Sequence, residues 1–232
     1  MTTFVLVHGA FHGGWCWKGV RERLIGTGHD VFCPTLTGVG ERHHLLTPAV
    51  DLWTHVDDVV NVLRWEELHD VVLVGHSYGG MVAGHVADRV PERIRRLVFL
   101  DAVIPENGKR LIDLVPDLGA MFLRQADELG DGWKVPPMPA AAFVDNPDEH
   151  AWVDRLLTAH PLACFQTAGN LQNPVGTVPS SYILARDFSP SPLIPFAKKA
   201  QDWGWQTCEL AGSHDLMIDN PEEVSQFLAD LP

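Results

Sequence analysis

The sequence has few of the residues on which several protein classes depend. Only four of its 232 residues are cysteine, and they form neither a C-x-x-C pair nor a close cluster, which excludes a disulfide-linked miniprotein and a structural zinc module. No apolar run approaches the ~18 residues that a membrane-spanning helix needs. Basic residues number 17 against 30 acidic ones, which argues against nucleic acid and anionic membranes as partners.

The remaining composition is that of an ordinary globular protein. Hydrophobic residues make up 46% of the chain and charged residues 20%, and the formal net charge is −13. Cys16, Cys33, Cys164 and Cys208 are expected to be buried free thiols of a reducing compartment. The first apolar run, at residues 4–7, follows no basic segment, so we expect a cytoplasmic protein without a signal peptide. A homodimer is compatible with these features.

Short runs of Val, Ile, Leu and Phe recur along the chain and predict strands. The central runs are continuous rather than alternating, which is typical of parallel strands covered on both faces. Residues 51–67 and 79–90, between such runs, have apolar side chains at helical spacing. The sequence therefore predicts an α/β fold with a six-stranded, mostly parallel sheet flanked by helices. The six runs are residues 3–7, 29–33, 70–74, 96–100, 181–185 and 205–209.

One long segment interrupts the alternation of strands and helices. Residues 103–177 hold eight of the 17 prolines and short helical patterns at 117–129 and 148–158. The segment is too small and irregular for a core of its own, so we interpret it as a cap inserted over one edge of the sheet. We expect residues 1–232 to form a single domain.

The clearest motif, Gly-His-Ser-Tyr-Gly-Gly at residues 75–80, lies between the strand run 70–74 and the helical pattern 79–90. A G-x-S-x-G sequence in this context is typical of a nucleophile elbow, in which a tight turn lifts the serine hydroxyl above the sheet. The alternative is a glycine-rich turn with an incidental serine. The flanking strand and helix favour Ser77 as a nucleophile.

A nucleophilic serine needs a base, and His214 is the best placed histidine. It lies in residues 211–215, between the last predicted strand and the last predicted helix, and a late loop of this kind reaches the carboxyl edge of the sheet. Most of the 12 histidines are expected to be surface groups or local hydrogen-bonding partners.

An oxyanion hole needs backbone N–H groups from the residue after the nucleophile and from an early loop. Tyr78 follows Ser77, and Ala10 lies in the glycine-rich segment 8–15 after the first strand. His8 and His12 have the i, i+4 spacing of zinc ligands, but the glycines around them oppose a helix, so no metal site is predicted.

The motifs HGAFHGGWCW, GHSYGG, LVFLDAVIPE and GSHDLM carry a family resemblance that covers nearly the whole chain. They resemble the α/β-hydrolase superfamily, in particular the small branch of plant methyl esterases, hydroxynitrile lyases and bacterial esterases, including hydrolases of carbamate fungicides such as carbendazim. The resemblance implies Ser77 as nucleophile, His214 as base, Ala10 and Tyr78 as oxyanion donors, and no cofactor.

The acid that completes the triad has two candidates. The plant enzymes of this branch carry it in the loop after the next-to-last strand, and Asp187 falls nearby but about one residue early. Asp101 ends the strand after the nucleophile helix, a second position from which this fold presents an acid to the histidine. We favour Asp101 narrowly and keep Asp187 as the alternative.

The expected substrate is a small, uncharged, aromatic ester or carbamate, with an amide as a further option. The five basic residues of the cap are dispersed among aromatic ones and do not resemble an anion-binding site. A lyase and a non-catalytic binding protein are the alternatives. Where the lyases of this branch have a threonine and a lysine, this chain has Phe11 and Asp215, and an aspartate facing the site would repel a departing cyanide. The predicted substrate-binding residues are Phe11, His12, Trp133 and Phe143.

Overall fold

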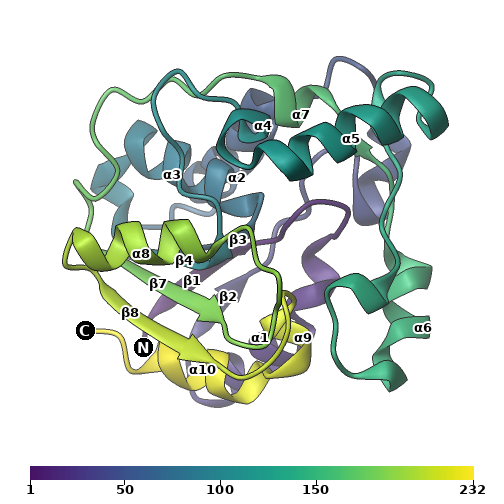
Figure 1. The fold of residues 1–232 in the computed structure, drawn as a ribbon. Helices are drawn as coiled ribbons and strands as arrows, with labels where there is room; N and C mark the ends of the chain where they lie inside the picture. The colour runs from purple at the N-terminus through teal and green to yellow at the C-terminus, as the bar shows by residue number, and fades with distance from the viewer.

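The computed structural model describes all 232 residues, and a six-stranded sheet forms its centre (Figure 1). The strand order is β2-β1-β3-β4-β7-β8, and every neighbouring pair is parallel. Each strand coincides with one of the six apolar runs, so the predicted fold class is confirmed. The strands are β1 (Thr3–Val7), β2 (Asp30–Phe32), β3 (Val71–Ser77), β4 (Ile94–Ala102), β7 (Ser180–Ala185) and β8 (Gln206–Leu210).

Helices cover both faces of this sheet. Val5 and Val7 pack into one apolar cluster, whereas Phe4 and Leu6 pack into another, because successive side chains of a strand point to opposite faces. This is why the strand sequences are apolar without alternation. The first face is covered by α2 (Leu52–Trp65), α3 (Gly79–Arg89) and α8 (Ile194–Asp202), and the second by α1 (Lys18–Gly26), α9 (Leu216–Asp219) and α10 (Pro221–Ala229).

Local signals fix the ends of two of these helices. The Asp51 side chain accepts a hydrogen bond from the Thr54 N–H at 2.9 Å and caps α2. Asn220 accepts one from the Glu223 N–H and caps α10, whose first residue is proline. Each such cap stabilises a helix by about 1 kcal/mol.

The segment between β4 and β7, residues 103–177, lies over the carboxyl edge of the sheet, and we refer to it as the cap. In Figure 1, α4, α5 and α7 lie together at the top of the view and α6 lies apart at the right. Phe122 and Phe165 of the cap belong to the same apolar cluster as α2 and α3. The cap contains α4 (Leu111–Leu114), α5 (Pro116–Leu129), α6 (Pro147–Leu156), α7 (Ala163–Gln166) and a two-stranded antiparallel pair, β5 (Lys134–Val135) and β6 (His160–Pro161).

Short 3-10 helices lie in the connections, and no helix of the structure has the combination of length and apolar character that a membrane span needs. All four cysteines are free. Cys16 and Cys164 are buried as expected. Cys33 and Cys208 are partly exposed because Cys33 directly follows β2 and Cys208 lies within β8, and these are the two edge strands of the sheet. The 3-10 helices are η1 (Gly14–Trp17), η2 (Gly40–Leu45), η3 (Pro91–Arg93) and η4 (Ala140–Ala142).

Candidate active site

Three polar side chains from distant parts of the chain meet at the carboxyl edge of the sheet. Ser77 ends β3, Asp101 is the penultimate residue of β4, and His214 follows β8. The carboxyl ends of parallel strands share one edge, which is where ligands bind in folds of this kind. Ser77 Oγ lies 2.9 Å from His214 Nε2, and His214 Nδ1 lies 2.6 Å from Asp101 Oδ2. The structure therefore aligns a hydroxyl, an imidazole and a carboxylate.

The turn that presents Ser77 is strained and crowded. Ser77 has a φ of 53°, in the left-handed region that side-chain-bearing residues rarely adopt. A Cβ at Gly75 would lie 2.5 Å from the Gly79 carbonyl oxygen, and a Cβ at Gly79 would lie 2.6 Å from the His8 carbonyl oxygen. The glycines of the motif are therefore required by the close approach of three backbone segments around the serine.

A bulge in β4 aims the Asp101 side chain. His76 pairs with Leu100 and Ser77 with Ala102, so Asp101 is the extra residue of the strand, and such a bulge redirects a side chain. Its carboxylate is fully buried. Oδ1 accepts a hydrogen bond from the Ala185 N–H at 3.1 Å. Because the carboxylate only accepts, His214 carries its proton on Nδ1, and Nε2 is free to accept the serine proton.

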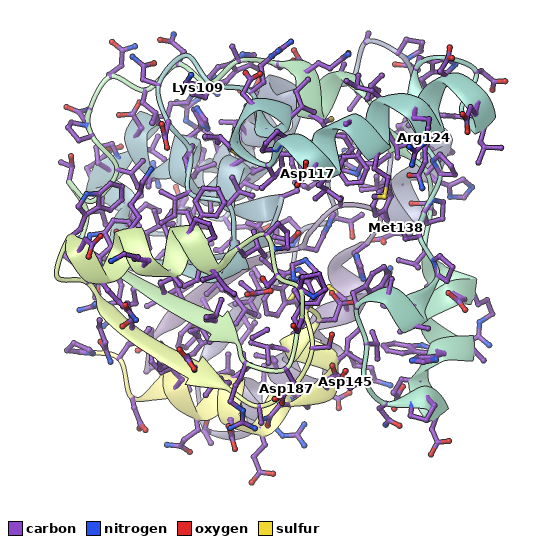
Figure 2. The ribbon with its side chains drawn as sticks, viewed as in Figure 1. Lys109, Asp117, Arg124, Met138, Asp145 and Asp187 are labelled. Carbon is purple, nitrogen blue, oxygen red and sulfur yellow. The ribbon has the colours of Figure 1, made fainter.

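Asp187, the alternative acid, lies elsewhere. It forms an ion pair with Arg186 at 3.2 Å, its side chain is 44% exposed, and its Oδ2 accepts the Gly212 N–H at 2.8 Å. The Gly212 N–H and the Arg186 guanidinium lower the pKa of Asp187. Figure 2 shows Asp187 low in the view, near Asp145 and well below Met138. The carboxylate in contact with His214 is that of Asp101.

The two predicted oxyanion residues lie beside Ser77. Ala10 and Tyr78 both border the cavity beside the serine, and neither N–H enters a backbone hydrogen bond of the protein. The hydroxyl of Tyr78 lies 2.9 Å from His55 Nδ1, and His55 Nε2 donates to the Thr37 carbonyl oxygen at 2.8 Å. His55 thus anchors the residue after the serine, a role that no local motif indicated.

The cavity beside Ser77 has a volume of about 250 Å³, and 13 of its 19 lining residues are hydrophobic. Three of the four predicted substrate-binding residues, Phe11, His12 and Phe143, line this cavity. The fourth, Trp133, does not line it. It lies in the turn between α5 and β5, where the Lys134 ammonium sits 5.2 Å from its ring centre. The apolar lining that sequence reasoning missed comprises Val103, Leu111, Leu118, Phe122, Met138, Ala142, Phe165, Phe188, Pro190, Pro192 and Leu193.

Asp215 also differs from its expected position. Its side chain is fully buried, and Oδ2 accepts a hydrogen bond from His12 Nε2 at 2.9 Å. It is not among the residues that line the cavity, so it cannot repel a departing anion directly, as the sequence had suggested. The main chain after His214 turns its next side chain inward, where His12 neutralises it.

His76, the variable residue of the serine motif, contacts the main chain of His214. Its Nε2 donates to the His214 carbonyl oxygen at 3.0 Å, and the two rings lie 4.6 Å apart. Burial and the neighbouring His214 hold the pKa of His76 well below its ordinary value, so the ring is neutral. This contact fixes the main chain at the position from which His214 reaches Ser77.

One further cluster has the composition of a metal site. The ligand atoms of His55, His160 and Cys164 lie within 4.8 Å of one another. Both nitrogens of His55 are already engaged, one with the Tyr78 hydroxyl and one with the Thr37 carbonyl. A metal bound here would break the contacts that anchor Tyr78, so these residues are better explained as part of the packing under the site.

Comparison with known proteins agrees with this architecture. The model of the alpha/beta hydrolase family matches residues 4–227, so the chain belongs to the alpha/beta hydrolase family. A carbendazim-hydrolyzing esterase from a Nocardioides species is 42% identical over the full length of both chains. Salicylic acid-binding protein 2 from Nicotiana tabacum is 34% identical over 45% of this chain and 40% of its own length.

Among solved structures, an extracellular alpha/beta-hydrolase from a Paenibacillus species superposes with a TM-score of 0.87 over 99% of this chain and 98% of its own. Its sequence identity is 23%, so this likeness concerns the fold. The resemblance to the branch of plant methylesterases and bacterial esterases is confirmed.

Proposed function

We propose that the protein is a serine hydrolase that cleaves a small, uncharged ester or carbamate through an acyl-enzyme. The observation that carries the proposal is the continuous hydrogen-bonded chain from Ser77 through His214 to Asp101 at the wall of an apolar cavity. Homology to an esterase that hydrolyses carbendazim supports the same reaction class.

In the first half of the reaction, Ser77 Oγ attacks the substrate carbonyl carbon while His214 Nε2 takes the hydroxyl proton. The N–H groups of Ala10 and Tyr78 stabilise the negative charge that develops on the carbonyl oxygen. The bond to the leaving group then breaks, and His214 gives the proton to the departing alcohol or amine. Asp101 stabilises the imidazolium that exists between these two transfers.

In the second half, water attacks the acyl carbon and gives a proton to His214. The bond to Ser77 breaks, the proton returns to Oγ, and a carboxylic or carbamic acid leaves. The balance needs only substrate and water. A carboxylate paired with the buried Nδ1–H keeps the imidazole oriented through both halves.

The lining of the cavity supports an uncharged, flat substrate. None of the basic residues of the cap borders the cavity, and Figure 2 shows Lys109 and Arg124 at the periphery of the molecule. Phe11, Phe122 and Phe165 form mutual edge and stacked contacts in the wall, which favours an aromatic ligand. The five basic residues are Lys109, Arg110, Arg124, Lys134 and Arg155.

The test is a hydrolysis screen of methyl and aryl esters, methyl carbamates and amides with purified protein. We expect turnover of small aryl esters or carbamates, and a loss of about 10⁴-fold or more in the Ser77→Ala variant, because the three groups act as a unit. Ser189→Ala, at an exposed serine, is the matched control. Cyanide release from mandelonitrile at a rivalling rate would assign a lyase instead, and no turnover of any substrate would indicate a binding protein.

A further inference from the structure

The loop that carries Ala10 is held by histidine side chains rather than by secondary structure. His8 Nδ1 donates to the Gly9 carbonyl oxygen at 2.8 Å, while its Nε2 accepts the Leu36 N–H at 3.1 Å. The Gly9 carbonyl and the Ala10 N–H belong to one peptide unit. The His8 contact therefore fixes the plane from which the Ala10 N–H projects.

The next peptide unit is held at both ends. His12 Nδ1 donates to the Ala10 carbonyl oxygen at 2.7 Å, and the Phe11 N–H donates to His160 Nδ1 at 3.3 Å. Phe11 has a φ of 70°, a left-handed conformation that persists in a non-glycine residue only when its surroundings impose it. These two contacts impose it here.

The second nitrogen of His12 reveals the charge state of the ring. Nε2 lies 2.9 Å from Asp215 Oδ2, so both ring nitrogens face oxygens that only accept hydrogen bonds. The ring must carry both protons and is an imidazolium opposite a carboxylate. His12 is 3% exposed and Asp215 is fully buried, and a buried pair of this kind is stable only while both charges are present.

We propose that His12, held as an imidazolium by Asp215, is a positioning residue that fixes the peptide after Ala10 and thereby aims the Ala10 N–H at the reacting carbonyl oxygen. This inference rests on the proposed hydrolysis at Ser77. It adds the requirement that His12 keep its proton, which limits hydrolysis at alkaline pH. The residues involved lie 203 positions apart in the sequence.

The surroundings of His12 leave Asp215 as its one charged neighbour. Burial lowers the pKa of His8 to about 3 and holds the pKa values of His76 and His160 well below their ordinary range, so these three rings are neutral. Trp15 stacks on the His12 ring at 5.2 Å, and Phe143 meets it edge-on at 5.6 Å.

The pair has a defined pH window. Burial acts to lower the pKa of His12, but the charge and hydrogen bond of Asp215 outweigh it, and the net direction is upward. Burial acts to raise the pKa of Asp215, and the charge and hydrogen bond of His12 reverse this to a net decrease. The ion pair is thus lost as the pH rises through the raised pKa of His12. On the acid side it is lost only as the pH falls through the lowered pKa of Asp215. Hydrolysis should therefore decline in alkali as His12 loses its proton.

The first experiment compares pH profiles of kcat for 4-nitrophenyl acetate hydrolysis. In the Asp215→Asn variant, the amide can donate to His12 Nε2 while Nδ1 still donates to Ala10, so the geometry survives with a neutral ring. We expect the alkaline decline to disappear and kcat to fall less than in His12→Gln, which loses about 10²-fold in kcat with KM within about threefold. An alkaline decline that is identical in Asp215→Asn and the wild type would overturn the proposal.

The second experiment separates positioning from folding. His12→Phe leaves the buried carboxylate of Asp215 without its hydrogen-bond donor and opposite charge, since the neutral His76 ring lies 3.6 Å from its other oxygen, and should lower Tm by about 10 °C. The double variant His12→Phe with Asp215→Leu replaces the ion pair by apolar groups and should recover most of that Tm. We expect its kcat to stay about 10²-fold low. Recovery of kcat together with Tm would show a purely structural pair and overturn the proposal.

A fluorophosphonate that reacts with serine tests the proposed function and the role of His12 separately. Absence of an adduct on Ser77 in the wild type would refute the proposed function itself. Labelling of the wild type, with His12→Gln labelled at the same rate, would refute only the role of His12. We expect slower labelling of His12→Gln, because the adduct has the tetrahedral geometry that the oxyanion hole stabilises.

Discussion

The two sides of the cavity are built differently. On the sheet side, each polar group is held by directed hydrogen bonds. The buried carboxylate of Asp101 contacts both His214 and the Ala185 N–H. On the cap side, the wall consists of apolar contacts such as the stacked rings of Phe122 and Phe165, 4.7 Å apart. Apolar contacts are non-directional, so the sheet side is suited to fixing the reaction, and the cap side to shaping what can enter.

Hydrogen bonds nevertheless connect the sheet side and the cap side of the cavity near His214. The Asp215 N–H donates to the carbonyl oxygen of Phe143 in the cap at 2.8 Å. The Asp219 carboxylate accepts hydrogen bonds from the Asp145 N–H and the Ser213 N–H at 3.0 Å and 3.1 Å. The loop that carries the histidine therefore also supports the cap wall.

The sharpest contrast is between the two aspartates at the sheet edge. Asp101→Asn should lower kcat by about 10⁴-fold, because an amide can donate to His214 and stabilise the wrong tautomer. Asp187→Asn, the matched control, should change kcat less than about threefold, since the Asp187 carboxylate forms hydrogen bonds with Arg186 and the Gly212 N–H and none with His214. Steady-state kinetics on one chromogenic ester measures both. The reverse ranking would transfer the acid to the later loop.

The cap side should set a limit on substrate size. A cavity of about 250 Å³ holds a compact molecule but not an extended chain, so kcat/KM for a C4 acyl ester should exceed that for a C16 ester by about 10²-fold. The two 4-nitrophenyl esters, assayed below their critical micelle concentrations, measure this ratio. Equal efficiency would contradict a closed cavity and indicate an open groove.

The smallest expected difference is between the effects on KM of replacing two aromatic residues of the cap. Phe143 lines the cavity and contacts the His12 ring, so Phe143→Ala should raise KM for an aryl ester about tenfold through lost apolar contact. Trp133 does not line the cavity, and Trp133→Ala should leave KM within about twofold. A larger effect at Trp133 than at Phe143 would mean that the cap adopts another arrangement when substrate binds.

Local pattern was sufficient for the sheet and the serine motif. Six apolar runs and one Gly-His-Ser-Tyr-Gly-Gly turn predicted the strands and the position of Ser77, because strand burial and a tight turn impose short-range rules on the sequence. The choice between Asp101 and Asp187 needed the bulge in β4, which depends on pairing with β3. No local rule encodes that register.

The cap and the residues that support the site from outside could not be predicted from the sequence, for a related reason. His12 and Asp215 meet across 203 residues, and His55 reaches the Tyr78 hydroxyl from a different helix. In the cap, aromatic residues occur throughout, and sequence alone did not show that Phe143 faces the cavity whereas Trp133 faces Lys134. Side-chain direction in an irregular segment is set by tertiary packing rather than by periodicity.

The central claim is that hydrolysis proceeds through an acyl group on Ser77, and trapping that intermediate tests it most directly. A 4-nitrophenyl ester is mixed with the protein, the reaction is quenched in acid within the first turnover, and the digested peptides are mapped by mass. We expect one acyl adduct, on Ser77 in the peptide that contains it, and no adduct in Ser77→Ala. An adduct on another side chain, or full activity in Ser77→Ala, would contradict it.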